Sequence, residues 1–215
     1  MKIEKKLIKD GYLLIAGVDE VGRGALAGPV VACAVLFDKD LLEYAEKLLG
    51  KEVNDSKLLS PAQREKLYRK IRELAPTSIG KVSNKKIDKI NILEATKLAM
   101  RKAILSLPSR PDIVLVDGNL KLNLDIPQLQ VIDGDRLCFS ISCASIVAKV
   151  VRDRIMERLH YRYNQYNFKR NKGYGTKEHI ESLYLYGPSP IHRRSFSPIR
   201  QALEAFEKGK IRKGS

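Results

Sequence analysis

The sequence predicts an α/β fold with a mixed β-sheet, followed by a helical C-terminal part. Short apolar, β-rich runs alternate with segments of helical periodicity over the first 140 or so residues, and only helical segments follow. The chain has 215 residues, which is enough to bury the core of one domain. We expect a single domain over residues 1–207, its helical part beginning near residue 160, and a frayed basic tail over 208–215.

Five short apolar runs are expected to form the strands, because runs of this length between turn residues are typical of buried strands. They cover residues 12–18, 29–37, 77–83, 112–119 and 129–135. Acids and glycines meet at the ends of the first, fourth and fifth runs, namely Asp19 and Glu20, Asp117-Gly118, and Asp135.

Six segments carry helical signals and cover residues 38–50, 61–74, 91–107, 141–163, 176–186 and 198–207. Gly50 is expected to end the first as its C-cap. Ser60 and Gln63 form a capping box around Pro61 at the start of the second. The segment 141–163 presents one apolar face, made of Ala144, Val147, Ala148, Val151, Ile155 and Leu159.

The charge balance favours a polyanionic partner. Lys and Arg number 40 against 25 Asp and Glu, a formal net charge of +15. Such an excess is typical of nucleic-acid binding, although it can also serve solubility alone. No apolar run is long enough to cross a membrane, and the N-terminal apolar stretch runs into the acids without a cleavage site, so we expect a cytoplasmic protein. Three cysteines without metal-site spacing are expected to be buried thiols: Cys33, Cys138 and Cys143.

Glycines follow the first strand closely, at Gly22, Gly24 and Gly28. A dinucleotide fingerprint would require a helix after them, but the residues from Pro29 onward have strand composition. Glycines also allow a backbone to approach a ligand closely, and Arg23 between two of them suits a phosphate. The alternative of a hairpin turn that only needs positive φ stays open.

Four acids share a position where a strand run meets a glycine turn: Asp19, Glu20, Asp117 and Asp135. Strand ends on one edge of a sheet converge, and carboxylates that meet there repel one another unless divalent cations bind. Two such ions can activate a phosphodiester for in-line attack. Asp133 competes with Asp135 for the fourth position, and the spacing to the following helix favours Asp135.

Seven collinear motifs together resemble bacterial ribonuclease HII over about residues 15–198: "GVDEVGRGALAGPVVACAV", "NDSKLLSP", "VLVDG", "GD", "SIVAKVVRDR", "NKGYGTKEH" and "PIHRRSF". The resemblance implies an RNase H-like fold with a helical C-terminal extension. It also implies cleavage of the RNA strand of RNA–DNA hybrids and cutting on the 5′ side of single ribonucleotides in duplex DNA. The implied products have 3′-hydroxyl and 5′-phosphate ends, as in ribonucleotide excision during DNA replication and repair.

The resemblance also assigns residues. It implies that Asp19, Glu20, Asp117 and Asp135 bind Mg²⁺ or Mn²⁺ and are catalytic. It implies that Gly22, Arg23 and Gly24 contact the ribonucleotide's 2′-hydroxyl and backbone, and that Tyr174 stacks on the sugar at the RNA-to-DNA junction.

From the residues themselves, Lys57 and Lys172 are candidate phosphate contacts. Asp153 lies about 200° around its helix from the apolar face, which favours a solvated or ion-paired role. The roles of Asp133, Asp153 and His192 stay open, and we expect a monomer.

Two rival functions remain at this stage. A non-catalytic nucleic-acid-binding module would explain the charge but not four convergent acids. A resolvase- or integrase-like nuclease of the same fold would share the acids and cut DNA. The Gly22-Arg23-Gly24 sequence together with Tyr174 favours an enzyme that senses ribose.

Overall fold

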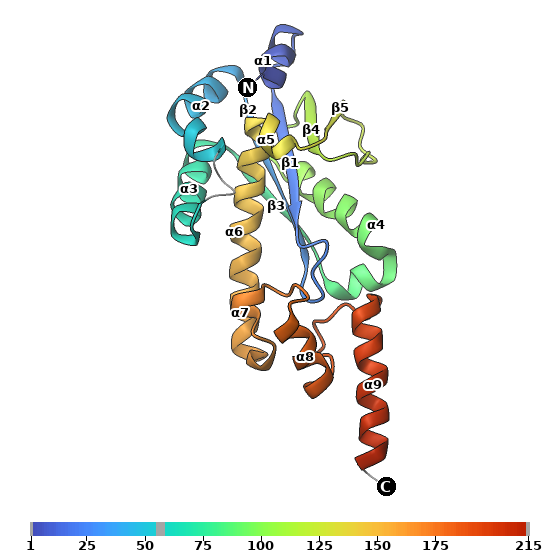
Figure 1. The fold of residues 1–215 in the computed structure, drawn as a ribbon. Helices are drawn as coiled ribbons and strands as arrows, with labels where there is room; N and C mark the ends of the chain where they lie inside the picture. Colours follow the sequence, from blue (N-terminus) through green and yellow to red (C-terminus); the bar gives the residue numbers. More distant parts are fainter. Residues whose placement is uncertain (1, 55–58, 214–215) are drawn as a thin grey trace. The chain divides into compact units, whose positions relative to one another are not determined.

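A five-stranded mixed sheet forms the centre of the fold. The computed structural model describes residues 2–54 and 59–213, with the side chains of all but residue 54 and residues 209–213. The strands are β1 (Ile15–Val21), β2 (Val30–Phe37), β3 (Thr77–Val82), β4 (Ile113–Asp117) and β5 (Gln128–Val131), in the order β3-β2-β1-β4-β5 (Figure 1). β1 pairs antiparallel with β2 and parallel with β4, and β4 pairs parallel with β5. The expected mixed α/β fold is therefore confirmed.

The first strand begins three residues later than the sequence predicts. β1 starts at Ile15 and continues to Val21, so Asp19 and Glu20 lie within the strand and not after it. β2 continues to Phe37 opposite Ile15, which keeps the whole of β1 paired. Helix α1 (Lys2–Lys9), which the sequence analysis does not predict, precedes it. Its Glu4 is fully buried and accepts hydrogen bonds from the backbone N and the Oγ of Ser140.

Helices cover both faces of the sheet. Alternate residues of β2, including Val35 and Phe37, pack against α2 (Lys39–Asn54), α3 (Pro61–Leu74) and α6 (Phe139–Arg162). Helix α4 (Asn84–Leu105) covers the other face with its part after residue 95, which belongs to the same compact unit as most of the sheet (Figure 1). A Cβ added at Gly80 of β3 would lie only 1.9 Å from the Ala99 oxygen, so α4 packs directly on the strand.

Two helix ends differ from the prediction. α2 passes through Gly50 to Asn54, because Gly50 adopts no positive φ and the next turn buries Val53 completely. α4 starts at Asn84 and not at residue 91, since Ser83 Oγ accepts from the Lys86 N and caps the earlier turn. The predicted start is instead a kink: Asn91 has φ 64° and ψ 168°, and its Oδ1 caps the following turn through the Glu94 N.

Other predicted ends hold. The capping box of Ser60 and Gln63 is present at the start of α3, with both reciprocal hydrogen bonds formed. The long helix α6 is predicted to within two residues at each end. The three cysteines are free and buried, as expected.

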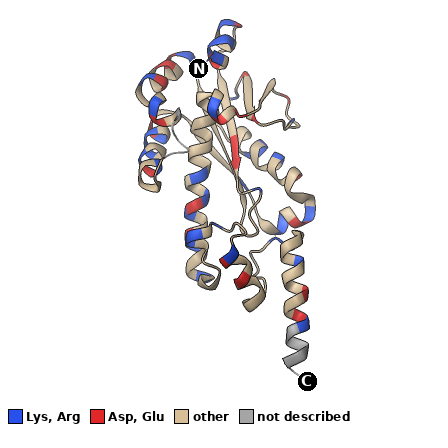
Figure 2. Cartoon of the chain, in the orientation of Figure 1, with Lys and Arg blue, Asp and Glu red and all other residues tan. Residues whose placement is uncertain are grey.

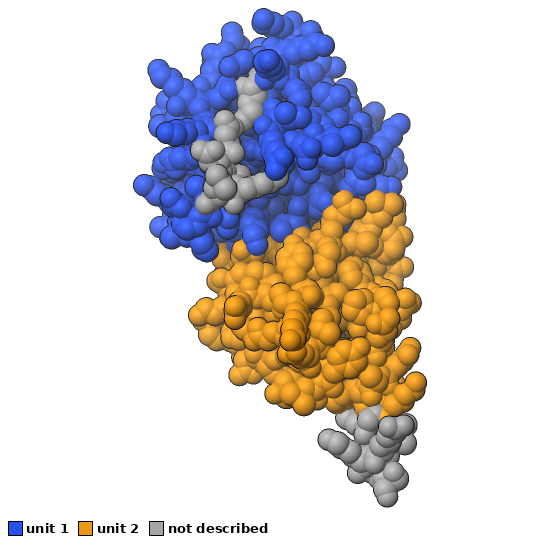
Figure 3. Space-filling model, viewed as in Figure 1, with its two compact units in different colours: residues 1–21, 31–81, 96–151 blue, residues 22–30, 82–95, 152–215 orange. Residues whose placement is uncertain are grey.

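The chain divides into two compact units (Figure 3). Unit 1 comprises residues 1–21, 31–81 and 96–151 and contains most of the sheet. Unit 2 comprises residues 22–30, 82–95 and 152–215. Its small elements are η2 (Asn164–Tyr166), α7 (Phe168–Asn171) and α8 (Lys177–Tyr186). Helix α9 (Ser197–Lys213) follows and includes most of the expected tail.

Basic side chains are distributed over many elements and not confined to one (Figure 2). They occur along α3, α6 and α9, while acidic residues mark the middle of the sheet at β1 (Figure 2). This distribution places acids in the sheet of a chain that is otherwise strongly basic.

Candidate active site

Asp19 and Asp117 occupy the same level of two adjacent parallel strands. The β1–β4 register pairs Val18 with Val116, and one further residue along each strand brings Asp19 beside Asp117. Both strands run in the same direction, so the two carboxylates are at the same edge of the sheet. The predicted convergence of these two acids in unit 1 therefore has a structural basis in strand register.

Burial and like charge act together on Asp19. Its side chain is 6% exposed. Desolvation first, and then the carboxylates of Glu20 and Asp117, raise the pKa of Asp19 well above its usual range. A hydrogen bond from Ser145 of α6 and the Glu20 N, 2.6 Å from Asp19 Oδ1, work in the opposite direction. Ser145 therefore stabilises the charged form of Asp19. The sequence analysis does not single out this serine.

Asp135 reaches the same edge from a helix, not from a strand. β5 ends at Val131, and Asp135 lies in the first turn of the short helix α5 (Gly134–Leu137), which corrects the prediction of a strand ending near Asp135. The Asp135 N lies 3.3 Å from Asp117 Oδ1, so it donates to that carboxylate. Gly134 permits this approach, because an added Cβ would lie 3.0 Å from the same oxygen and 2.6 Å from Ile141.

A pocket of about 270 Å³ in unit 1 is lined by both acidic and basic side chains. Its lining includes Glu20 and Asp135 together with Arg64, Ser145 and Lys149. Arg64 and Lys149 are cations that sequence reasoning missed. A usable signal existed for Lys149, since Ser145 and Lys149 are four residues apart in "SIVAKV" and therefore share one helix face.

The carboxylates have the chemistry that hard divalent cations prefer. Asp19 and Asp117 are adjacent in register, Asp135 contacts Asp117, and the mutual repulsion that raises the pKa of Asp19 is what a bound cation would relieve. Within residues 2–54 and 59–213, no three ligating side chains are already arranged as a closed metal cluster. The carboxylate oxygens are thus suitable ligands for a divalent cation. Their side chains are not yet arranged as a complete coordination shell in the described residues.

The glycine segment belongs to unit 2 and has its own supports. Gly22 and Gly28 have φ values of +92° and +79°, which L side chains rarely adopt. Gly22 is buried, whereas Arg23 and Gly24 are exposed. A Cβ at Gly22 would lie 2.1 Å from the Nε of Arg152. The positive-φ turn considered for this sequence is therefore present at Gly22, while Gly24 has a different environment.

Gly24 has open space around its Cα. No atom of the described part of the chain lies within 4 Å of a Cβ built there, neighbouring residues aside, and its φ is not positive. Neither its conformation nor packing inside the chain requires glycine at this position.

Tyr174 is 37% exposed and is held from two sides within unit 2. The guanidinium carbon of Arg152 lies 5.3 Å from the centre of its ring, and its backbone oxygen lies 2.8 Å from His179 Nδ1. Its exposed ring area is available to a ligand.

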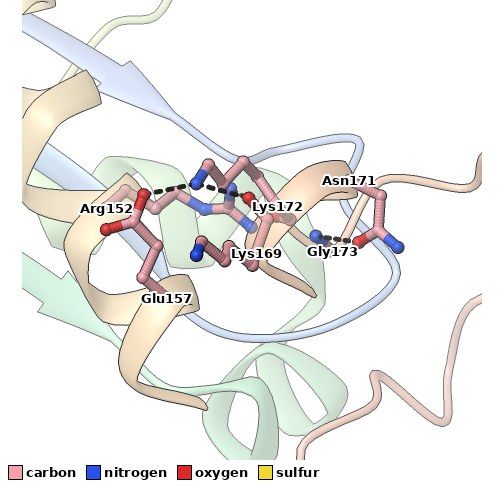
Figure 4. Close-up of polar contacts among 6 residues, drawn as sticks. All are labelled: Arg152, Glu157, Lys169, Asn171, Lys172 and Gly173. Carbon is pink, nitrogen blue, oxygen red and sulfur yellow. Dashed lines mark hydrogen bonds and ion pairs between the residues drawn. The ribbon is translucent and has the colours of Figure 1, made fainter. Parts of the chain in front are cut away.

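Lys172 is already engaged in the structure. Its Nζ lies 2.6 Å from Glu157 Oε1 and donates to the Lys169 oxygen at 2.7 Å (Figure 4). Asn171 Oδ1 accepts from the Gly173 N and fixes the next turn (Figure 4). Lys57, the other candidate phosphate contact, lies outside the described residues.

The residues whose roles were left open have distinct environments. Asp133 is exposed and adopts φ 54° just before α5. Asp153 is half-buried on α6. His192 is 1% exposed and contacts His179, so it is part of the core of unit 2.

The fold and the acids define a class of protein. A mixed sheet with carboxylates on adjacent parallel strands, in a chain of net charge +15, is the arrangement of a nucleic-acid hydrolase of the RNase H-like class. Comparison with known proteins then gives the family.

The family model for ribonuclease HII matches residues 16–199. The ribonuclease HII of Dehalococcoides mccartyi is 50% identical over 205 residues, covering 94% of each chain. That of Caldicellulosiruptor bescii is 52% identical over 196 residues, covering 91% of this chain and 92% of the relative. The crystal structure of ribonuclease H2 from Pyrococcus horikoshii OT3 superposes with a TM-score of 0.76 at 32% identity, covering 91% of this chain and all of that one.

The chain belongs to the ribonuclease HII family. This confirms the expected metal-dependent endoribonuclease that cleaves RNA in RNA–DNA hybrids and at ribonucleotides embedded in DNA, and it favours that activity over the two rivals. Within the part of the chain that the structure describes, none of the helices has the length and apolar character needed to span a membrane.

Proposed function

We propose that the chain cuts on the 5′ side of a ribonucleotide in duplex DNA or in a hybrid, leaving a 3′-hydroxyl and a 5′-phosphate. The observation that carries the proposal is the register of Asp19 beside Asp117, with Asp135 in contact with Asp117. These carboxylates concentrate negative charge at one place, and that charge repels the phosphates of a nucleic-acid substrate. Cations are therefore needed before the phosphate can approach.

Asp19, Glu20, Asp117 and Asp135 would hold two Mg²⁺ or Mn²⁺ ions. When bound, such ions neutralise charge on the scissile phosphodiester and activate water for in-line attack. The protein's own contribution is to keep the carboxylates in place: Ser145 donates to Asp19, and the Asp135 N donates to Asp117. These hydrogen bonds restrict Asp19 and Asp117, which lowers the cost of completing the site when cations and substrate bind.

Gly22, Arg23, Gly24 and Tyr174 would recognise the ribonucleotide. The exposed Gly24 backbone and the exposed part of the Tyr174 ring support this assignment. A 2′-hydroxyl is both donor and acceptor, and it is what distinguishes RNA from DNA at one position. Lys172 would contact phosphate only by exchanging Glu157 for it, and Lys57 remains a candidate from its sequence motif.

The test uses three matched duplexes: all DNA, DNA with one ribonucleotide, and an RNA–DNA hybrid. With Mg²⁺ or Mn²⁺, the second and third should be cut and the first left intact. Mass spectrometry should find a 5′-phosphate and a 3′-hydroxyl, because water and not the 2′-hydroxyl attacks. A 2′,3′-cyclic phosphate, or equal cutting of the all-DNA duplex, would contradict the proposal.

A further inference from the structure

Two arginines of unit 2 are completely buried. Arg152 and Arg193 are both 0% exposed, although arginine is among the residues that are rarely found fully buried. The three guanidinium nitrogens of Arg193 each donate to a backbone oxygen: Nη2 to Gly22 at 2.7 Å, Nη1 to Arg23 at 2.7 Å, and Nε to Gly28 at 3.1 Å. One side chain therefore holds both ends of the segment 22–28.

Arg152 connects the same segment to the chain before Tyr174. Its Nε donates to Pro29 O at 3.1 Å and its Nη2 to Ala27 O at 3.2 Å. Its Nη1 donates to Lys172 O at 2.9 Å, and its guanidinium carbon lies 5.3 Å from the centre of the Tyr174 ring. A backbone hydrogen bond from the Leu26 N to the Gly173 oxygen, 2.7 Å long, adds a direct link.

This arrangement is costly to maintain. Burial, followed by the neighbouring Arg152, lowers the pKa of Arg193, which means that the folded state disfavours its charge. Burial likewise lowers the pKa of Arg152. Two like charges at the core of a small unit are a poor choice for stability alone, since apolar residues of similar volume are often at least as stabilising.

The geometry points to a functional reason. We propose that Arg152 and Arg193 are positioning residues for ribose recognition: they fix the Gly22-Arg23-Gly24 backbone and Tyr174 as one rigid unit. This inference rests on the proposed function, in which these two elements contact the ribonucleotide. Arginine suits the task because its rigid planar fork donates from three separate nitrogens, whereas lysine donates from a single nitrogen.

The mechanism by which they act is preorganisation. A recognition group that is displaced by about 1 Å can reduce a rate by about 100-fold, even when the change is remote from the reacting atoms. Loss of one guanidinium would release the backbone oxygens of residues 22, 23 and 28, or the tie between Ala27 and Lys172. Binding of the duplex through exposed basic residues would not depend on these contacts.

The experiment compares Arg152→Lys and Arg193→Lys with the wild type and with Arg158→Lys, an exposed arginine on the same helix as Arg152. It measures kcat and KM on a duplex with one ribonucleotide, the Kd for an all-DNA duplex, and the folded fraction by circular dichroism. Normalised to folded protein, kcat should fall by about 30- to 100-fold in both lysine variants, with the all-DNA Kd changed less than about threefold. Arg158→Lys should match the wild type.

Retention of kcat within about twofold in folded lysine variants would overturn the inference, since a misplacement effect should be much larger. A parallel loss of all-DNA binding and of kcat would also overturn it, because that is the result of a purely structural role. If the wild type itself does not prefer the ribonucleotide duplex, the proposed function fails, and the two failures are thereby distinguished.

A second variant covers the case in which neither lysine variant folds. Asp88 accepts from the backbone N of Arg194 and of Ser195 at 3.1 and 2.9 Å, and so fixes the segment that carries Arg193 from the surface. Asp88→Ala removes no buried group and should lower kcat by about threefold or more at an unchanged all-DNA Kd. An unchanged kcat in this variant would overturn the inference.

Discussion

The Nε2 atoms of His179 and His192 lie 3.0 Å apart in the core of unit 2, and the surrounding hydrogen bonds determine both tautomers. His179 Nδ1 lies 2.8 Å from the Tyr174 oxygen, so it must carry a proton, and its Nε2 accepts. His192 Nε2 must then donate. Its Nδ1 consequently accepts from the Ser189 N at 2.9 Å. A second proton on either ring would break this chain.

Acid should therefore destabilise the fold. Burial, then the neighbouring His179, lowers the pKa of His192 to about 3, whereas an unfolded histidine titrates near 6.5. Below about pH 6.5 the unfolded state takes up a proton that the folded state refuses, so stability falls as the pH decreases, by up to about 1.4 kcal/mol for each unit. Urea unfolding between pH 7.5 and 5 measures the slope.

The matching variants separate this effect from general acid sensitivity. His192→Gln should be less stable at pH 7.5 but should lose less stability on going to pH 5. His160→Gln, at a partly exposed position on α6, should keep the wild-type slope. An identical slope in the His192 variant would show that other groups cause the acid sensitivity.

Asp117→Asn should abolish cleavage and preserve the fold. Loss of several kcal/mol of cation-dependent stabilisation corresponds to a rate decrease of at least about 100-fold. Removing the charge beside the buried Asp19 should also raise Tm without divalent ions, by about 2–4 °C for each kcal/mol of repulsion relieved. Product gels and calorimetry in EDTA measure the two effects.

The control for this prediction is Asp10→Asn, an exposed acid after α1, which should change neither quantity. Full activity of the Asp117 variant, or of the wild type in EDTA, would contradict a role of these acids in holding the metal.

Gly22→Ala and Gly24→Ala should have different effects although the two glycines flank one arginine. Gly22→Ala meets a φ of +92° and the buried Arg152, so it should lower the free energy of unfolding by at least about 1 kcal/mol. Gly24→Ala meets open space, so Tm should stay unchanged. If substrate approaches this backbone, kcat/KM on the ribonucleotide duplex should still fall.

Gly50→Ala, inside helix α2, is the matched control and should raise stability by up to about 1 kcal/mol at unchanged activity. Normal kcat/KM in Gly24→Ala would place the ribose contact elsewhere.

Duplex binding should weaken with salt, and the exposed pair Lys169 and Arg170 should contribute to it. Each phosphate contact adds a slope of about −0.9 in log K against log salt on B-DNA. Replacing both with glutamine should reduce the slope by up to about 1.8 units, as measured by fluorescence anisotropy. Lys172 is left unchanged because it pairs with Glu157.

Lys47→Gln with Lys51→Gln, two exposed changes on α2, removes the same charge and should leave the salt slope near the wild-type value. If this control flattens the slope as much as the Lys169 and Arg170 pair does, the effect is one of net charge and not of local contacts.

Local signals in the sequence determined most of the elements. The capping box at Ser60 fixed the start of α3, because its hydrogen bonds involve only residues close in sequence. The strand composition after Pro29 excluded a dinucleotide site, and β2 is there. Seven motifs in order identified the family, which the comparison over residues 16–199 confirms. The candidate acids were also named from the sequence, since each stands beside an apolar strand run.

Tertiary structure decided what depends on distant partners. The register of β1 and β4 set Asp19 beside Asp117, and strand pairing over 98 residues leaves no local trace. Helix α2 continues beyond Gly50, although glycine often ends a helix, because the additional turn buries Val53. The burial of Arg152 and Arg193 was not predictable, because their hydrogen-bond acceptors are backbone oxygens 20 to 171 positions away along the chain. Backbone oxygens exist at every residue, so only the folded chain determines which of them an arginine meets.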